Sequence, residues 1–256
     1  MGMPQADLDR DLINAALPYW EAEALVARRF FDAKPGPEAQ LRWLRAQVWK
    51  ELNPVDGYFN GIHRELSNLA DAFPGLEKTV DRHAFSFQMR QIVEEFEHYV
   101  MFADILEMVS GRKLDPSELT QLPQERKLGE LRRSLAESGS EIDRAAVLFT
   151  EGGGARLFRE GAKLAGGELE RKIAHAMQVI YDDERDHFKE GAKHAAELIK
   201  SDADLARMKD GIVAVSSQRV AMRTEMFGQP VPQDELEAFI AATRARIARG
   251  EVLEAG

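Results

Sequence analysis

Two short segments place a carboxylate three residues before a histidine: Glu95-Phe96-Glu97-His98 and Glu184-Arg185-Asp186-His187. Residues at positions i and i+3 lie on one face of an α-helix, about one turn apart. A carboxylate and a neutral imidazole in this arrangement can bind one divalent transition metal. None of the other four histidines has an acidic residue three positions before it. The two pairs therefore predict two helices that face each other across a metal site.

The rest of the sequence is also typical of helices. Ala, Leu, Glu, Arg and Lys are abundant, and no segment alternates apolar and polar residues as a half-buried strand does. Proline and glycine divide the chain into segments. We expect helices over about 17–31, 38–72, 79–110, 140–164, 168–200, 203–226 and 234–248, with a bend or break at Asn53-Pro54 and a long polar connection over 112–138 that contains a short helix near 127–135.

Four of these helices form two hairpins. The turns near Pro74-Gly75 and Gly166-Gly167 are short, and short turns join antiparallel neighbours. The connection between the hairpins is much longer. We therefore predict an all-α fold in one domain over 1–256, with a four-helix bundle over 38–200, an N-terminal helix within 1–37 and a helical extension over 201–256.

The two hairpins match each other in sequence. Residues 94–98 align with 183–187, and Val55-Asp56-Gly57 aligns with Thr150-Glu151-Gly152. At about 1.5 Å per residue, the acid on each first helix lies near the height of the Glu-x-x-His pair on its partner helix. All four long helices are therefore expected to offer a carboxylate near one level of the bundle.

The acidic residues share helix faces with apolar ones. Glu95 lies on a stripe with Phe102, and Glu184 lies on a stripe with Ile180, which is typical of faces that point into a bundle. Interior carboxylates without a cation would repel one another. The pattern therefore favours a metal site, and a metal-free bundle with solvated charged faces is the alternative.

These features resemble the ferritin-like di-iron carboxylate superfamily, in its oxidase and oxygenase branch, where two helices each give one acid and two others each give a Glu-x-x-His pair. The resemblance covers about residues 40–200. It implies two iron ions, with manganese or a mixed manganese–iron pair as the alternative, and O2 as co-substrate. The implied ligands are Asp56, Glu95 and His98 for one metal and Glu151, Glu184 and His187 for the other, with Glu95 and Glu184 bridging both ions as the catalytic carboxylates.

The first-helix acid is the least typical member of this set. The superfamily usually has Glu where this chain has Asp56, two residues after Pro54. Glu51 is an alternative on a different helix face. His63 lies seven residues after Asp56 on the same face, so it is a candidate extra or substitute ligand, or a polar residue that lines the bundle.

Other residues are candidates for supporting roles. The resemblance implies that Glu94 and Asp183 hydrogen-bond to ligand histidines and orient them. Tyr181 lies one turn before Glu184 and either approaches the metals or packs in the core. The run Gly152-Gly153-Gly154 follows Glu151, and it either leaves a cavity for substrate or O2 or permits close helix packing.

Composition limits the remaining possibilities. The net charge of −10 argues against broad nucleic-acid binding, and the absence of cysteine excludes thiolate sites. We find neither an apolar run long enough to span a membrane nor a secretory signal, so we expect a cytoplasmic protein. The arginines at 219, 223, 244, 246 and 249 are interpreted as solvated helix faces.

These observations predict a di-metal oxidase or oxygenase that activates O2 to oxidise a small organic substrate. The alternatives are a ferroxidase or iron-storage protein and a non-catalytic metal-binding bundle. The expected partners are the small-molecule substrate and, as a further candidate, an electron-donor protein. The expected state is a monomer or homodimer. The sequence does not specify the substrate.

Overall fold

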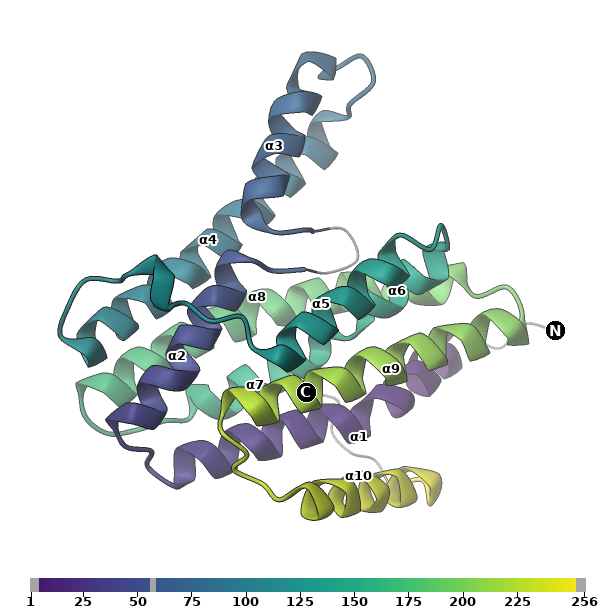
Figure 1. The fold of residues 1–256 in the computed structure, drawn as a ribbon. Coiled ribbons are helices and arrows are strands. Elements are labelled where there is room, and N and C mark those ends of the chain that lie inside the picture. The colour runs from purple at the N-terminus through teal and green to yellow at the C-terminus, as the bar shows by residue number, and fades with distance from the viewer. Residues whose placement is uncertain (1–4, 56–58, 252–256) are drawn as a thin grey trace.

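The structure is a computed structural model that describes residues 5–55 and 59–251, with the side chains of all of these except 5–6 and 185–191. Within these ranges it contains helices and no strand, which confirms the all-α prediction (Figure 1). No helix in the described ranges combines the length and the apolar character needed to cross a membrane. The α-helices are α1 (Gln5–Asp32), α2 (Pro37–Leu52), α3 (Ile62–Ala72), α4 (Arg82–Ser110), α5 (Pro123–Ala136), α6 (Glu141–Phe149), α7 (Glu151–Ala162), α8 (Glu168–Leu198), α9 (Asp202–Met226) and α10 (Gln233–Ala248), with short 3-10 helices η1 (Phe73–Gly75) and η2 (Pro116–Glu118).

Two helices predicted as single segments are divided. The expected segment 38–72 forms α2 and α3, because Pro54 has no N–H and disfavours helix at the residue before it. The expected segment 140–164 forms α6 and α7, which meet at Thr150. The Thr150 hydroxyl donates a hydrogen bond to the Val147 carbonyl oxygen at 2.7 Å. The second break therefore falls directly before the predicted ligand Glu151.

The N-terminal helix is longer and more central than predicted. It begins near Gln5 rather than Leu17 and runs through Pro18. A proline inside a helix costs about 3 kcal/mol, which is offset here because Leu12 and Ala16, before the proline, are fully buried. The whole of α1 packs along α7 and α9. It is therefore part of the helical core and not an addition to a four-helix bundle.

The central helices enclose one large apolar core. Helix α7 packs against α8 and α1, α2 packs against α4, and α4 packs against α8 (Figure 1). Helix α9 covers α1, α5 and α6, and α10 packs on α1. The fully buried Trp43 ring lies 5.8 Å from Phe102 and 5.7 Å from Phe227. This packing fixes the positions of α2, α4 and α8, which carry the candidate site.

One hairpin projects from these helices. Helix α3 and the N-terminal part of α4 extend beyond the rest of the fold (Figure 1), and α3 packs mainly on α4 and η1. Asp81 caps α4, because its carboxylate accepts hydrogen bonds from the backbone N–H groups of His83 and Ala84 at 2.8 and 2.9 Å. Helix α4 then continues without interruption into the core and ends at Gly111, whose φ is +70°.

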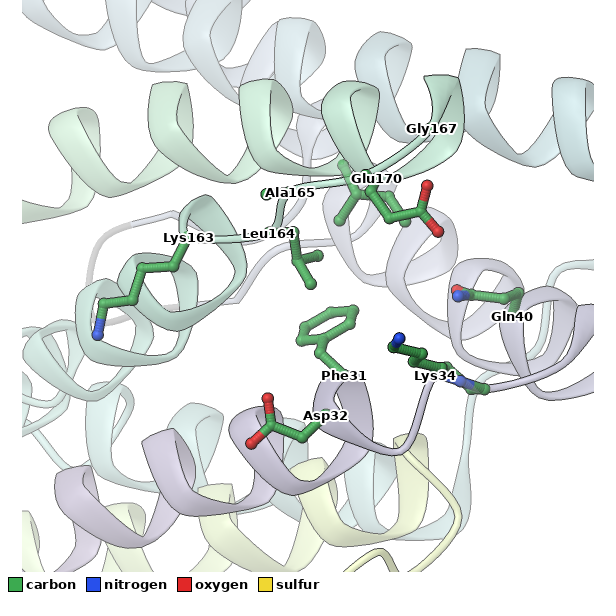
Figure 2. Close-up of a pocket in the computed structure, with 12 residues that line it drawn as sticks. Phe31, Asp32, Lys34, Gln40, Lys163, Leu164, Ala165, Gly167 and Glu170 are labelled. Carbon is green, nitrogen blue, oxygen red and sulfur yellow. The ribbon is translucent and has the colours of Figure 1, made fainter.

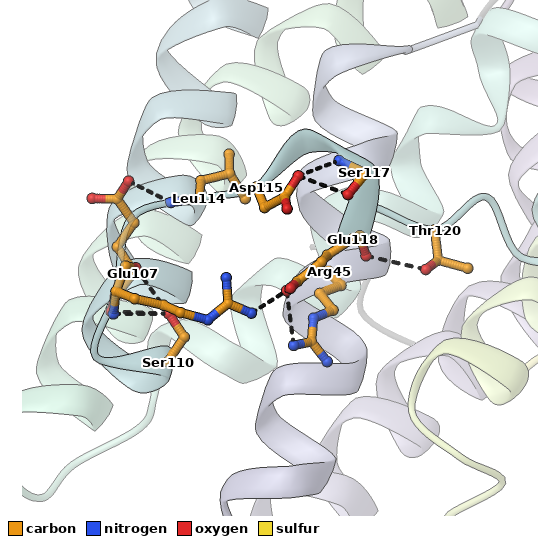
Figure 3. Close-up of polar contacts among 9 residues, drawn as sticks. Arg45, Glu107, Ser110, Leu114, Asp115, Ser117, Glu118 and Thr120 are labelled. Atoms are coloured by element: carbon orange, nitrogen blue, oxygen red, sulfur yellow. Dashed lines mark hydrogen bonds and ion pairs between the residues drawn. The ribbon is translucent and has the colours of Figure 1, made fainter.

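The connection after α4 is ordered by polar contacts (Figure 3). Glu107 accepts a hydrogen bond from the Leu114 backbone N–H at 2.9 Å. Asp115 caps η2 by accepting from the Ser117 backbone N–H at 2.9 Å. Arg45 of α2 donates to Glu118 at 3.1 Å, which ties the connection to the bundle. The segment predicted as a polar connection with a short helix therefore contains η2 and the longer helix α5.

Candidate metal centre

Three side chains converge between α2 and α4. Glu51, in the last turn of α2, and Glu95 and His98 of α4 each offer a ligand atom, and these atoms lie within 4.8 Å of one another. Glu51 and His98 are each only 2% exposed. Glu95 and His98 lie one turn apart on the side of α4 that meets α2. The structure therefore brings the first Glu-x-x-His pair together with an acid from another helix.

The acid that joins Glu95 and His98 in the structure is Glu51 of α2. The predicted ligand Asp56 lies outside the described residues. His63 is exposed on α3, so it does not line the bundle as expected. The prediction for His63 was wrong because it rested on continuous helix faces over 38–72. The chain instead forms two helices, α2 and α3, that are separated at Asn53-Pro54.

Asp183 of α8 orients the histidine. The Nε2 atom of His98 lies 2.9 Å from Asp183 Oδ2, and its Nδ1 atom lies 3.8 Å from Glu95 Oε2. The hydrogen bond predicted between Asp183 and a site histidine is therefore present. Burial alone would lower the pKa of His98, but hydrogen bonds to Asp183 and Glu95 and the negative charge of Glu51 raise it to about 10.

The carboxylates crowd one another. Burial raises the pKa of Glu95, and the charges of Glu51 and Glu184 raise it further, while the hydrogen bond with His98 acts in the opposite direction. Each effect except the last disfavours an ionised carboxylate. Without a cation, the ionised form of Glu95 is therefore disfavoured in this cluster.

The second predicted ligand set is described in part. Glu184 is half-buried on α8, and a β-carbon placed on Gly154 would lie 3.6 Å from its Cδ atom. Glu151 is the half-buried first residue of α7. Burial lowers the pKa of Arg219, but Glu23, Glu184 and Glu151 raise it overall, so both predicted acids lie within electrostatic reach of this arginine.

The remaining predicted site residues on α4 and α8 are Glu94, Tyr181 and His187. The side chain of His187 lies outside the described residues. Glu94 is half-buried on α4. Tyr181 packs against the main apolar core, which agrees with the second of the two roles considered for it.

The glycine run packs against α1. A β-carbon on Gly152 would lie 2.7 Å from Trp20 Cη2, and one on Gly153 would overlap the Glu23 carboxylate. These two glycines therefore permit close approach of α7 and α1 and do not line a cavity. Gly154 faces Glu184 and Arg219, whose Nη2 atom would lie 3.0 Å from a β-carbon there. The expected substrate cavity at Gly152 and Gly153 is therefore corrected to close helix packing.

A buried layer of charged side chains formed by α1 and α9 was not predicted from the sequence. Arg219 donates two hydrogen bonds to Glu23, at 2.9 and 3.2 Å, and Arg223 Nε lies 3.7 Å from the same carboxylate. Arg223 also donates to Gln47 at 2.9 Å, and Gln47 donates to Glu51. A continuous polar chain thus runs from α1 through α9 to the candidate ligand Glu51.

The exposure of these groups corrects the sequence interpretation. Arg219 and Arg223 are 3% and 0% exposed and are not on a solvated helix face. Glu23 is also fully buried. It lies in the mostly apolar stretch 22–27, Ala-Glu-Ala-Leu-Val-Ala, and this isolated acid was the available signal for a buried ion pair.

A surface pocket lies apart from the cluster of Glu51, Glu95 and His98. Its volume is about 450 Å³, and it lies between the end of α1, the start of α2 and the α7–α8 connection (Figure 2). Phe31 and Leu164 give it apolar walls, while Lys34, Gln40 and Glu170 provide polar groups. None of its lining residues belongs to the cluster around Glu95.

Comparison with known proteins identifies a shared fold. A TenA homologue from Pseudomonas syringae pv. tomato has a similar structure, with a TM-score of 0.58, 16% sequence identity, and coverage of 85% of this chain and 91% of that chain. No protein-family model matches the sequence, and no curated protein matches it. At this level of identity the likeness concerns the helical fold alone.

Proposed function

We propose that the chain is a di-metal oxidase or oxygenase, with iron as the metal, that uses O2 to oxidise a small organic substrate. The observation that carries the proposal is the cluster of Glu51, Glu95 and His98. Carboxylate oxygen and imidazole nitrogen are donors that suit iron and manganese. The resemblance of the two Glu-x-x-His pairs to the ferritin-like di-iron carboxylate superfamily supports a second metal.

The charge of the cluster fits a divalent cation. One buried and one half-buried carboxylate, together with the imidazole of His98, would hold a divalent cation in place of the proton that the imidazole otherwise binds. The Nε2–H group can keep its hydrogen bond to Asp183, which holds the ring in one orientation and one tautomer. Glu51 is held in turn by the Gln47 amide.

The second ion would be held by Glu151, Glu184 and His187. The charge of Glu184 acts on Glu95, and α8 packs on both α4 and α7, which supports this assignment. Arg219 lies beside Glu184 and Glu151 and balances part of their charge.

Bound iron would supply the electrons and open coordination positions that O2 activation requires. The residues of the chain itself hold the ligand side chains in position. Asp183 positions the His98 ring, and the Glu23–Arg219 pair forms a charged layer behind the ligands. Close approach of Gly152 to Trp20 packs α7 tightly on α1.

Metal content tests the proposal directly. The full-length chain is loaded with Fe(II) without O2, iron per chain is measured, and the visible spectrum is followed after O2 is added. We expect Glu51→Ala and His98→Ala to lose most bound iron and the O2-dependent spectral change. His63→Ala is the matched control, because His63 is exposed on α3, and it should retain both. Failure of the wild type to bind iron, or full iron content in His98→Ala, would contradict the proposal.

A further pair of variants decides between the two candidate acids. If Glu51 is the ligand from the first hairpin, Glu51→Ala loses iron while Asp56→Ala retains it. The reverse result would assign the site to Asp56 and contradict the assignment to Glu51.

A further inference from the structure

The exposed apolar side chains are confined to one region. Among the described residues, every large apolar side chain that is exposed belongs to α3, η1 or α4, and their exposed fractions are 40–61%. The full set is Leu66, Phe73, Phe87, Met89, Val93, Phe96 and Val100. Scattered exposed apolar residues are ordinary, but several of them on one face of a helix mark an interaction surface.

Four of these residues form a regular stripe along α4. Met89, Val93, Phe96 and Val100 follow one another at spacings of four, three and four residues, which is the spacing of the apolar seam in a coiled coil. At 3.6 residues per turn they fall within an arc of about 60°. Glu95 and His98 lie on another side of the same helix, toward α2 and α8. The stripe is therefore a helix-packing surface distinct from the candidate metal site.

We propose that this stripe binds a second copy of the chain, with the two α4 helices antiparallel about a two-fold axis between Val93 and Phe96. In this register Met89 packs against Val100 of the partner subunit. Val93 packs against Phe96 of the partner subunit, and each contact occurs twice. The apolar stripe is thus complementary to itself.

The charges beside the stripe support the antiparallel register. His83, Arg90, Glu97 and Asp104 recur every seven residues along one flank, and all four are exposed. In an antiparallel pair this flank faces the same flank of the partner, so Arg90 meets Glu97 of the partner subunit twice. His83 meets Asp104 of the partner subunit in the same way. Within the described part of the chain, neither Arg90 nor Glu97 forms an ion pair of its own.

A parallel pairing lacks this match. It would place Arg90 and Glu97 against the opposite flank of the stripe, where Phe85 and Ile92 are buried and Tyr99 is half-buried in their own subunit. Those residues offer no opposite charge. The charge pattern therefore selects a two-fold antiparallel dimer.

The exposed area is adequate for a dimer. With about 190 Å² for a fully exposed large apolar side chain, the four stripe residues offer roughly 350 Å². Phe73, whose ring lies 6.0 Å from that of Phe85, raises the apolar area to roughly 450 Å². A stable interface buries about 800 Å² per partner, somewhat more than half of it apolar, so these residues supply the apolar part.

The mass of the full-length chain in solution, measured by sedimentation velocity over a range of micromolar concentrations, tests the proposal. We expect a dimer for the wild type and a monomer for Phe96→Glu, which places a charge at the centre of the stripe. Phe87→Glu is the matched control, because Phe87 is exposed on the opposite side of α4, and it should remain dimeric. Far-UV circular dichroism checks that each variant is folded.

A charge exchange tests the register independently of apolar packing. Arg90→Glu and Glu97→Arg should each weaken the dimer about tenfold, because each creates two contacts between like charges. The double variant Arg90→Glu/Glu97→Arg should recover most of the affinity. A monomeric wild type would overturn the proposal, whether or not it binds lipid vesicles or another protein, and so would a dimer that Phe96→Glu leaves intact. Two weakened single variants without recovery in the double variant would overturn the antiparallel register.

Discussion

Replacing Glu23 with glutamine removes the negative charge that two buried arginines share. Arg219 donates to Glu23 at 2.9 and 3.2 Å, and Arg223 Nε lies 3.7 Å from it, while all three side chains are at most 4% exposed. Glutamine keeps the size of the side chain and one acceptor oxygen, so the loss is chiefly one of charge. Breaking a buried ion pair at one partner costs about 3–5 kcal/mol. We expect the lower end, about 3 kcal/mol, which is a large part of the 5–15 kcal/mol typical of a folded protein.

Urea unfolding of the metal-free chain, followed by circular dichroism at neutral pH, measures this loss. The midpoint for Glu23→Gln should fall by about 1 M without a change in the dependence of the free energy of unfolding on urea. Glu235→Gln is the control, since the Arg29–Glu235 pair is about half exposed and contributes less than about 0.5 kcal/mol. Adding Arg219→Met to Glu23→Gln should cost less than the sum of the two single changes. A loss below about 1 kcal/mol for Glu23→Gln would refute this account of the buried layer.

Three further predictions concern packing, pH and helix capping. Gly153→Ala should lower the free energy of unfolding by about 2 kcal/mol, because its β-carbon would overlap Glu23 and lie 2.8 Å from Trp20. Gly129→Ala, whose β-carbon would have its nearest contact 3.6 Å away, should raise the free energy of unfolding by about 0.5–1 kcal/mol. Thermal unfolding compares the two variants. Asp143→Asn should cost about 1 kcal/mol near neutral pH, because the bidentate pair with Arg207, at 2.7 and 2.8 Å, lowers the pKa of Asp143 from its ordinary 3.8. That contribution is fully present above the ordinary pKa of 3.8 and is lost as the pH falls through the lowered pKa of the folded state, so the difference between wild type and variant should shrink as the solution is made more acidic. Asp81→Ala should speed hydrogen exchange at the His83 and Ala84 amides, which it accepts from in the structure; unchanged exchange would contradict its role as the cap of α4.

Helix content could be predicted from the sequence, but helix ends and helix packing could not in every case. Periodicity and turn residues identified the all-α class and the hairpin of α7 and α8. The length of α1 was underestimated, since the helix runs through Pro18 and burial of Leu12 and Ala16 outweighs the cost of a proline inside the helix. Rules based on local sequence do not include the stabilisation that a helix gains from burial against other helices.

The candidate site was predicted best where its residues share one helix. Glu95 and His98 lie one turn apart on α4, so their proximity follows from helix geometry alone. Glu51 was considered but placed on a different face from Asp56, and the sequence did not show that α2 ends at Leu52, directly after Glu51. Glu23 and Arg219 come from helices far apart in sequence, and no spacing rule joins them.

The projecting hairpin also has a consequence for protein engineering. Helix α3 packs mainly on α4 and η1, whereas Phe102, Ile105 and Leu106 anchor the C-terminal half of α4 in the interior. The rotational setting of Glu95 and His98 is therefore anchored by the packing of the C-terminal half of α4. We therefore expect that an insertion between residues 72 and 80, before the cap of α4, leaves the direction of the ligand face of the helix unchanged. The tip of the hairpin is thus the place where we expect this chain to accept inserted sequence without a change in the positions of Glu95 and His98.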